Sequence, residues 1–368
     1  MDKSGNIYKN KKVLITGNTG FKGSWLTIWL LKLGATVYGI SKDIPTEPSM
    51  FKELGLENQV VHHETDVRDL ESVKKIIQEI RPDFLFHLAA QSLVSVSYSD
   101  PIETISTNVL GTTNVLEGLK ESNHNCVGVI ITSDKCYGNM EWVWGYKESD
   151  TLGGKDVYSG SKSAAELIFK SYYHSFFKKD GSNVKVVTTR AGNVIGGGDW
   201  ALNRIVPDCM RSWSKNEIVE IRSPKATRPW QHVLEPLSGY LELGHQLSIG
   251  DELNGESFNF GPLAQYSHTV EELIRELSGY WDFQDPSKAY IITNDIKFHE
   301  ASLLKLNCDK ALFYLKWLPT LSYKKLIEFT GSWYFNFYKS QKNMLDFTLS
   351  QINEYELIAS SKEIQWTK

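Results

Sequence analysis

The sequence predicts an α/β protein in which a doubly wound parallel sheet carries a smaller C-terminal lobe. Three observations lead to this prediction. Short apolar runs alternate with longer stretches of helical periodicity over the first 190 residues, a glycine-rich turn follows the first apolar run, and loop-like sequence begins after Arg190. Alternating strands and helices of this kind form a parallel sheet that is covered on both faces and joined by right-handed crossovers.

Seven apolar runs have the length and composition of buried strands, namely residues 11–16, 35–41, 59–64, 83–88, 126–131, 184–190 and 257–260. Four stretches between the first six runs predict helices, at residues 24–33, 70–80, 102–120 and 158–177. The run at 257–260 follows the loop-like region, and we expect it to return to the sheet as a further strand.

These elements suggest two intertwined lobes. We expect residues 11–190, with a returning segment near 233–261, to form a dinucleotide-binding domain. Residues 191–232 and 262–345 carry no nucleotide fingerprint, and we expect them to form a lobe that closes over a substrate. Residues 346–368 are expected to form a C-terminal tail, to which the sequence assigns no purpose.

The bulk composition narrows the class of protein. The 368 residues are 41% apolar, which is ordinary for a soluble globular chain. A net charge of -4 provides no basic field for nucleic acid, and no apolar run reaches membrane-spanning length. The first ten residues are polar and lack the apolar core of a signal peptide. Four scattered cysteines indicate reduced thiols and no metal site. We therefore expect a cytoplasmic protein without nucleic-acid or membrane partners.

The first predicted strand runs into a glycine-rich turn that leads to the first helix. Glycine permits a tight turn and a close approach to a pyrophosphate, and the N-terminus of the helix attracts phosphate. The spacing Gly-x-x-Gly-x-x-Gly departs from Gly-x-Gly-x-x-Gly, so a plain glycine-rich turn is the alternative. The order of strand, turn and helix favours a Rossmann-type dinucleotide site, with contacts from Gly17, Thr19, Gly20, Phe21, Lys22 and Gly23.

The second predicted strand bears on the choice between NAD and NADP. In such folds an acidic residue at the end of this strand holds the adenosine ribose. Here the strand ends in Ser41, followed by Lys42 and Asp43. Asp43 facing the ribose favours NAD, whereas Lys42 facing a 2′-phosphate favours NADP. The sequence leaves both open, and we favour NAD.

Three later segments add candidate cofactor contacts. Asp66 and Val67 follow the third strand, and Asp66 either accepts a hydrogen bond from adenine or caps the helix at 70–80. The small residues Ala89 and Ala90, followed by Gln91, let the chain pass close under a cofactor after the fourth strand. Asn108 lies inside an apolar helical pattern, where it either ties two backbone segments together or faces solvent.

The chemistry is expected at the ends of the fifth strand and the following helix. Ser133, Asp134 and Lys135 follow the fifth strand, at the edge where α/β sheets place their ligands. Tyr158 and Lys162 share one helix face, and a neighbouring ammonium favours the phenolate, lowering the tyrosine pKa from about 10 toward neutral. Such a tyrosine can accept a hydroxyl proton while a hydride leaves the same carbon. Alone, Tyr-x-x-x-Lys is a common surface pair, and the upstream glycine turn makes it informative.

Longer motifs identify a resemblance to the extended short-chain dehydrogenase/reductase family, over about residues 11–333. Within that family the chain is similar to the sugar-nucleotide 4,6-dehydratases that act on CDP-D-glucose. The motifs are Thr-Gly-Asn-Thr-Gly-Phe-Lys-Gly-Ser-Trp-Leu at 16–26, Ala-Ala-Gln at 89–91, Thr-Ser-Asp-Lys-Cys-Tyr at 132–137, Glu-Trp-Val-Trp-Gly-Tyr at 141–146, Arg-Ala-Gly-Asn-Val-Ile-Gly-Gly-Gly-Asp-Trp at 190–200 and Arg-Pro-Trp-Gln-His-Val at 228–233. Asn18, Gly138 and Val157 stand where relatives tend to carry His, Glu and Pro, and none of these changes removes a group that the chemistry needs.

The resemblance implies a homodimer, in which the helices at 102–120 and 157–177 form a four-helix bundle, and a reaction in three parts. The hexose is oxidised at C4 with NAD as hydride acceptor, water is lost across C5 and C6, and the hydride returns to C6. Tyr158 would take the C4 hydroxyl proton, Ser133 would share that hydrogen bond, and Lys162 would hold Tyr158 and the nicotinamide ribose.

The resemblance also implies roles for the neighbouring residues. Asp134 would protonate the leaving C6 hydroxyl, and Lys135 stands where better-known relatives carry a glutamate base for C5. The alternatives are that Asp134 caps a turn and Lys135 points to solvent. Arg228 suits a diphosphate because guanidinium binds two oxygens at once, although a surface ion pair is the alternative. The other expected substrate contacts are Gln91, Ser133, Asn193, Arg204 and His232.

Two other functions compete with dehydration. A sugar-nucleotide 4-epimerase or reductase of the same family shares Tyr158, Lys162 and the glycine turn but usually lacks an acid after the serine at position 133. A non-catalytic NAD-sensing regulator would have little reason to keep Ser133, Tyr158 and Lys162 together. The pair Asp134 and Lys135 therefore favours dehydration.

Overall fold

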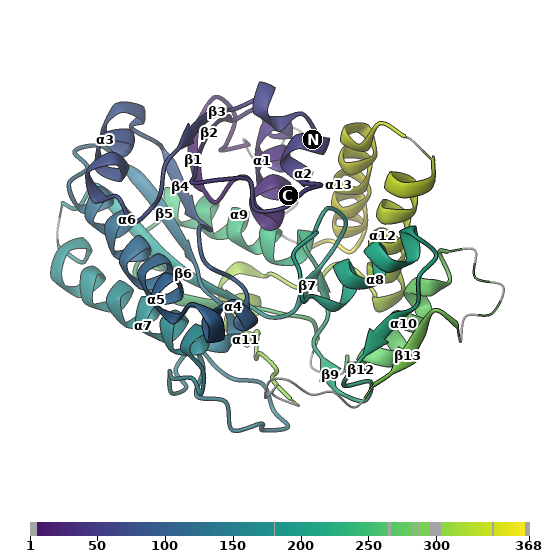
Figure 1. Cartoon of the computed structure of the whole chain (residues 1–368). Coiled ribbons are helices and arrows are strands. Elements are labelled where there is room, and N and C mark those ends of the chain that lie inside the picture. The colour runs from purple at the N-terminus through teal and green to yellow at the C-terminus, as the bar shows by residue number, and fades with distance from the viewer. Residues whose placement is uncertain are drawn as a thin grey trace.

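A seven-stranded parallel sheet forms the centre of the molecule (Figure 1). The computed structural model describes residues 6–179, 181–263, 266–281, 283, 285, 288–293, 303–340 and 342–364. Residues 1–5 of the polar N-terminal stretch and residues 365–368 of the predicted C-terminal tail therefore lie outside the described part. The spatial order of the strands is β11, β6, β5, β4, β1, β2, β3. Their bounds are β1 (Lys12–Thr16), β2 (Thr36–Ser41), β3 (Val61–Glu64), β4 (Phe84–His87), β5 (Cys126–Ile131), β6 (Val184–Ala191) and β11 (Ser257–Phe260).

All seven strands agree with the predicted runs to within two residues at each end, and every pairing is parallel. The predicted doubly wound α/β class is confirmed. Both faces of the sheet are covered, and so successive residues of β1 enter different cores: Val13 and Ile15 join one cluster, and Leu14 joins the other. The near-continuous apolar character of the strands follows from this double burial.

Helices cover the two faces of the sheet in two groups. One core contains side chains of α1 (Phe21–Lys32) and α9 (Leu234–Ile249), and the other contains side chains of α3 (Leu70–Ile80), α6 (Gly111–Lys120) and α7 (Val157–Tyr172). Figure 1 shows these groups on either side of the sheet. Between the strands lie the shorter helices α2 (Met50–Glu53), η1 (Leu56–Asn58), α4 (Val94–Ser99), η3 (Asp134–Cys136) and η4 (Tyr173–Phe177).

The predicted helix at 102–120 contains a π-helical interruption. Its segments are α5 (Pro101–Ile105), the π-helical η2 (Ser106–Leu110) and α6. Single π turns inside helices are frequent at functional sites. Here the π turn carries Asn108, whose contacts are described below.

The second lobe, at the right of Figure 1, is built from short strands and helices. Three two-stranded sheets pair β7 with β10, β9 with β12, and β8 with β13. The bounds of these strands are β7 (Val194–Ile195), β8 (Val219–Ile221), β9 (Thr227–Arg228), β10 (Gln231–His232), β12 (His268–Thr269) and β13 (Tyr290–Ile292). The helices after β7, apart from α9, are α8 (Ile205–Ser214), α10 (Val270–Ser278), α11 (Asp309–Leu315), α12 (Tyr323–Phe335), η6 (Asn336–Ser340) and α13 (Met344–Ser361).

The described part of the predicted C-terminal tail is a packed helix. Glu356 of α13 accepts a hydrogen bond from Trp29 Nε1 at 2.9 Å and pairs with Lys32 at 2.6 Å, which ties α13 to α1. Gln351 donates to the Phe329 carbonyl of α12 at 2.8 Å. The helix therefore joins the element that follows the glycine turn to the second lobe. Within the described residues, no helix is both long enough and apolar enough to cross a membrane.

Candidate active site

The glycine turn between β1 and α1 is packed too closely for larger residues at two positions. Gly17 adopts φ +77°, and a Cβ there would lie 2.7 Å from the backbone nitrogen of Ala89. A Cβ at Gly23 would overlap the Gly17 carbonyl oxygen. Gly20 is the N-cap of α1, and no side chain caps the helix there. The first N–H groups of α1, from Phe21 onward, are therefore suited to bind a phosphate.

Two side chains fasten this turn to the neighbouring strands. Asn18 is fully buried, and its Oδ1 accepts a hydrogen bond from Ser41 Oγ at 2.9 Å. Its Nδ2 lies 3.3 Å from His62 Nδ1. Thr19 Oγ1 donates to the Asp43 carbonyl at 2.7 Å. Asn18 and Thr19 thus hold the turn against β2 and β3 and the segment that follows β2.

The two candidates for the ribose contact lie in different surroundings. The Asp43 side chain is exposed. Lys42 is paired with Glu103 of α5, with Nζ and Oε1 2.7 Å apart. The Lys42 ammonium is therefore already paired with a carboxylate of the protein. This pairing makes it less available to a 2′-phosphate, the group that distinguishes NADP from NAD.

Asp66 is paired with Arg68 and does not cap α3. Its Oδ2 lies 2.5 Å from Arg68 Nη2, and this hydrogen bond lowers the pKa of the Asp66 carboxyl. The cap of α3 is Asp69, whose Oδ1 accepts from the Ser72 backbone at 3.2 Å. The capping alternative for Asp66 is therefore wrong. Val67 is buried, and Asn114 binds its carbonyl oxygen at 3.0 Å.

The segment Ala89-Ala90-Gln91 follows β4, and its first residue packs against Gly17 of the glycine turn. The Gln91 side chain is used locally, since Nε2 donates to Thr104 Oγ1 at 2.8 Å and Oε1 accepts from the Leu93 backbone at 2.6 Å. Both hydrogens of Nε2 are thus used, because this nitrogen also donates to the Leu93 carbonyl at 3.0 Å, whereas Oε1 accepts one bond and can accept a second.

Asn108 joins this segment to α7. Its Nδ2 donates to the Gln91 carbonyl at 3.0 Å and to Ser161 Oγ at 2.9 Å. The side chain is buried, so the solvent-facing alternative is wrong. The π turn of η2 carries this amide at the junction of the cofactor segment and the helix that bears Tyr158.

Ser133, Asp134 and Lys135 form a compact polar group at the carboxyl end of β5. Ser133 Oγ lies 3.0 Å from Asp134 Oδ1 and accepts from the Lys135 backbone at 3.2 Å, so Ser133 and not Asp134 caps the following turn. Lys135 Nζ lies 3.2 Å from Asp134 Oδ2. The Asp134 side chain is 3% exposed and that of Lys135 is 30% exposed, so the carboxylate is buried and the ammonium is partly accessible.

Asp134 also faces the second lobe. A Cβ at Gly192 would lie 3.3 Å from Asp134 Oδ2 and 3.5 Å from the Pro229 ring. Gly192 follows β6 and Pro229 follows β9, so both the Asp134 carboxylate and the Pro229 ring lie next to Gly192. A side chain at position 192 would therefore crowd this carboxylate oxygen.

Tyr158 and Lys162 are both buried on the first turns of α7, which Asp156 caps by accepting from the Ser159 backbone at 2.9 Å. The expectation that the Tyr158 pKa falls toward neutral is wrong for the protein by itself. Burial raises the Tyr158 pKa to about 12, although a hydrogen bond with Ser133 opposes the rise. Burial also lowers the pKa of Lys162 to about 8, against the opposing effects of Cys136 and Glu166.

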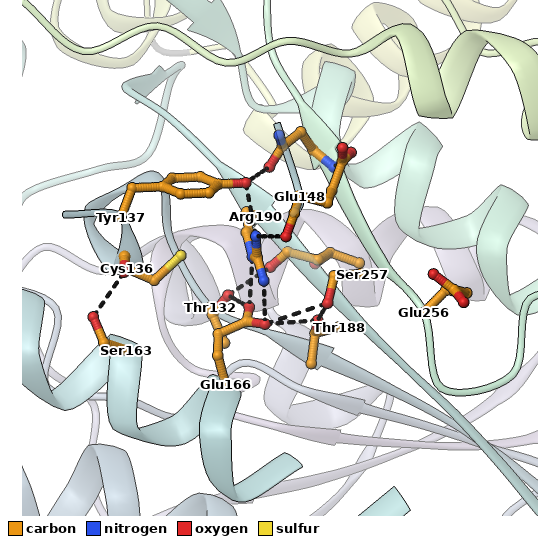
Figure 2. Close-up of polar contacts among 12 residues, drawn as sticks. Thr132, Cys136, Tyr137, Glu148, Ser163, Glu166, Thr188, Arg190, Glu256 and Ser257 are labelled. Carbon is orange, nitrogen blue, oxygen red and sulfur yellow. Dashed lines mark hydrogen bonds and ion pairs between the residues drawn. The ribbon is translucent and has the colours of Figure 1, made fainter. Parts of the chain in front are cut away.

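A fully buried ion pair joins α7, the helix of Tyr158 and Lys162, to β6 (Figure 2). Arg190 of β6 and Glu166 of α7 lie 2.7 Å apart, and both side chains are 0% exposed. The hydroxyls of Thr132 and Thr188 also donate to Glu166. Arg190 Nη1 lies 2.7 Å from the Tyr137 hydroxyl. These bonds join α7 to β5 and β6, and so they fix the distance from Tyr158 to Ser133.

Two residues of the second lobe, Arg204 and Asn193, differ in their contacts near Ser133, Asp134 and Tyr158. Arg204 pairs with Asp199 at 2.9 Å and donates to Ser92 Oγ at 2.9 Å, bridging from the second lobe to the segment after β4. Its guanidinium also opposes the rise of the Tyr158 pKa, which places the positive charge near the phenol. The Asn193 carbonyl accepts from the Gln231 backbone at 3.1 Å, and Asn193 Oδ1 is a buried acceptor without a hydrogen bond from any described residue.

Arg228 and His232 differ in accessibility. Arg228 is half-buried and its Nη1 donates to the Thr227 carbonyl at 3.0 Å. His232 is 0% exposed and packs edge-on against Trp25 and Phe329, and burial lowers its pKa to about 3. The ring is therefore neutral, and its buried Nε2 has no hydrogen-bond partner among the described residues.

Lys22 is a site residue whose charge environment the sequence did not reveal. It is half-buried in the first turn of α1. Burial and then the Arg204 guanidinium lower its pKa to about 8, while Asp134 opposes the shift. Lys162 lowers it further. The ammonium therefore lies among charged groups of both lobes, close to Asp134.

The arrangement fits a dinucleotide beside a hydroxylated substrate. The uncapped N-terminus of α1 suits a pyrophosphate, and the two close approaches at Gly17 and Gly23 shape the turn around it. Buried Asn108 Oδ1, on η2, and Asn193 Oδ1, on the loop between β6 and β7, are acceptors without partners among the described residues. Ser133, Tyr158 and Asp134 together offer two hydroxyls and a carboxyl, which suffice for proton transfer at neighbouring carbons.

A family model described as GDP-mannose 4,6 dehydratase matches residues 14–330 of this chain. A CDP-glucose 4,6-dehydratase of Salmonella typhimurium is 45% identical over 317 residues, which covers 85% of this chain and 88% of the relative. A dTDP-glucose 4,6-dehydratase of Haemophilus influenzae is 23% identical over 88% of this chain and 97% of its own length.

Solved structures confirm the fold. A UDP-glucose-4-epimerase from Stenotrophomonas maltophila with bound NAD superposes with a TM-score of 0.77 at 19% identity, covering 90% of this chain and all of the other. A dTDP-glucose 4,6-dehydratase from Streptomyces venezuelae gives 0.73 at 21% identity, covering 88% and 96%. The expected extended short-chain dehydrogenase/reductase resemblance is confirmed, and the chain belongs to the GDP-mannose 4,6 dehydratase family.

Proposed function

We propose that this chain catalyses the NAD-dependent dehydration of CDP-D-glucose to CDP-4-dehydro-6-deoxy-D-glucose. The observation that carries the proposal is the contact of Asp134 with Ser133, at 3.0 Å, beside the hydroxyl of Tyr158. A tyrosine and serine pair serves oxidation at C4, and only dehydration needs a carboxyl group next to it. The 45% identity to a CDP-glucose 4,6-dehydratase supports the same substrate.

In the first step Tyr158 accepts the C4 hydroxyl proton, with Ser133 sharing the hydrogen bond. NAD, when bound, would supply the hydride acceptor for C4 and the hydride donor for C6. Because burial raises the Tyr158 pKa to about 12, the free protein holds the phenol protonated at neutral pH. Lys162, whose ammonium is retained below about pH 8, adds positive charge that helps stabilise the phenolate.

In the second step a proton leaves C5 and the C6 hydroxyl departs as water. Asp134 is the proposed acid at C6, and it must hold a proton to act. Lys135, 3.2 Å from Asp134, is the proposed base at C5. Replacement of Lys135 by Met should abolish exchange of the C5 proton with solvent, and exchange at the wild-type rate would remove the base role from Lys135.

The substrate diphosphate is proposed to lie between the lobes, bound by Arg228, Arg204 and Asn193. The buried Asn193 Oδ1 is an acceptor, so it suits a substrate hydroxyl, and the amide nitrogen suits a phosphate oxygen. We assign cofactor binding to residues 11–190 with the segment near 233–261, and substrate binding to 191–232 and 262–345.

A homodimer is proposed on the basis of exposed apolar side chains on the helices that carry the site. Ile102 of α5 is 72% exposed and Leu167 of α7 is 54% exposed. Figure 1 shows α5 and α7 on the same outer side of the sheet. Light scattering should give twice the chain mass, and Leu167→Glu should reduce it to the chain mass. The cysteines of the described residues are free thiols, which fits the proposed cytoplasmic location.

The experiment that tests the function is incubation with NAD and each of CDP-, dTDP-, UDP- and GDP-glucose, followed by mass analysis. The expected result is a product lighter by one water with CDP-glucose as the best substrate. A sugar nucleotide of unchanged mass would establish a 4-epimerase instead. NAD binding without turnover of any of the four would favour a regulator.

A further inference from the structure

Four charged side chains form a chain of ion pairs at the ends of β2 and β3. Lys42 and Arg68 both bind Glu103 of α5, and Arg68 also binds Asp66. Thr107 Oγ1 donates to Glu103 Oε1 at 3.3 Å and adds a further bond to that carboxylate. Glu103 therefore holds two cations that come from two different strand ends.

The position of this network relates it to the cofactor. The glycine turn is fastened to the same strand end, because Thr19 binds the Asp43 carbonyl at 2.7 Å. In folds of this type the adenosine ribose lies at the end of the second strand, where a basic side chain accommodates the 2′-phosphate of NADP. This step rests on the proposed binding of NAD.

Lys42 and Arg68 are the cations closest in sequence to those strand ends, and each is already matched by a carboxylate. Among the described residues Glu103 is the only ion-pair partner of Lys42. The hydrogen bond from Lys42 lowers the pKa of Glu103, so the carboxylate is ionised at neutral pH. A 2′-phosphate would have to compete with Glu103 for both cations and would bring a second negative group next to it.

We propose that Glu103 determines the cofactor preference: by binding Lys42 and Arg68 it withholds both cations from a 2′-phosphate and keeps the site selective for NAD. The selectivity thus depends on a residue of the π-interrupted helix and not only on the strand end. Asp43, the exposed carboxylate of the strand end, acts in the same direction but holds neither cation through a side-chain bond in the structure.

The test measures binding of adenosine fragments by calorimetry, so that it needs no turnover. The probes are 5′-ADP, 2′,5′-ADP, NAD and NADP. For Glu103→Gln we expect affinity for 2′,5′-ADP and NADP to rise about tenfold, as expected for a released charge-assisted contact, with 5′-ADP and NAD changed less than about threefold. Glu79→Gln is the matched control, because Glu79 pairs only with Lys75 on the exposed face of α3, at 4.0 Å.

A double variant identifies the released cation. Lys42→Ala combined with Glu103→Gln should lose most of the gain for 2′,5′-ADP. Unchanged affinity for 2′,5′-ADP in Glu103→Gln, with NAD still bound and the fold intact by circular dichroism, would overturn the inference and leave the proposed function standing. Equal binding of 5′-ADP and 2′,5′-ADP by the wild type would also overturn it. Failure of the wild type to bind NAD would overturn both.

Discussion

The two ends of the sheet's carboxyl edge hold their charges in different ways. Below Ser133 and Tyr158, Glu166 and Arg190 are 0% exposed, and hydroxyl donors also bind the carboxylate. At the ends of β2 and β3, the side chains of Lys42, Arg68 and Glu103 are 44%, 32% and 23% exposed. Ion pairs in water are weak and adjustable, whereas a buried pair cannot lose one partner without leaving an uncompensated charge. The proposed catalytic residues thus lie at the end that has the buried ion pair, and the proposed cofactor selection lies at the end that has the exposed ion pairs.

The largest expected effect comes from breaking the buried pair. Glu166→Gln leaves the Arg190 guanidinium without a counter-charge, and the free energy of unfolding should fall by about 3–5 kcal/mol. Urea denaturation followed by circular dichroism measures the change. A loss below about 1 kcal/mol would show that the pair does not fix α7 against β5 and β6.

Asp134→Asn should act on chemistry and not on folding. The amide keeps the shape but cannot donate the proton to C6, so product formation should fall about 10²–10⁴-fold. Oxidation at C4 should continue, and the absorbance of reduced nicotinamide should accumulate in a single turnover. Asp251→Asn, at a position 83% exposed, is the matched control. Full activity of Asp134→Asn would remove the proposed acid from the mechanism.

The pH dependence should report Lys162. Burial lowers its pKa to about 8, so the ammonium is present below that pH and is lost above it. We expect kcat/KM to fall by about tenfold for each pH unit above about 8. The Glu166 charge raises the Lys162 pKa, so in any Glu166→Gln protein that remains folded this limb should move to lower pH. If kcat/KM began to fall at the same pH in Glu166→Gln as in the wild type, the electrostatic effect of Glu166 on Lys162 would be contradicted.

The smallest effect is expected at the exposed end. Lys42→Ala removes one partner of a solvent-exposed pair, and the free energy of unfolding should change by less than about 1 kcal/mol. The same urea titration measures it. A loss as large as that of Glu166→Gln would erase the distinction between the two ends.

The sheet was predictable from the sequence because each strand is a short apolar run bounded by turn residues, and all seven agree with the prediction to within two residues. The grouping of Ser133, Asp134 and Tyr158 followed from the rule that ligands lie at the carboxyl ends of parallel strands. The helix at 102–120 was predicted without its π turn, since hydrophobic periodicity does not register one extra residue.

Other features depend on contacts between distant segments. Glu103 and its partner Lys42 are 61 residues apart in the sequence, and Arg190 and Glu166 are 24 apart. No local sequence pattern therefore predicts either ion pair. The sequence predicted a lowered Tyr158 pKa because it showed the lysine four residues away but not the burial that raises this pKa. The burial of His232 against the rings of Trp25 and Phe329 likewise could not be foreseen from the sequence.

The central claim is that a hydride removed from C4 of the hexose is returned to C6 of the same molecule after water is lost. The most direct measurement uses CDP-glucose labelled with deuterium at C4 and locates the label in the product by NMR. The account predicts a product lighter by one water with the deuterium at C6. Deuterium retained at C4 in a product of unchanged mass would contradict it.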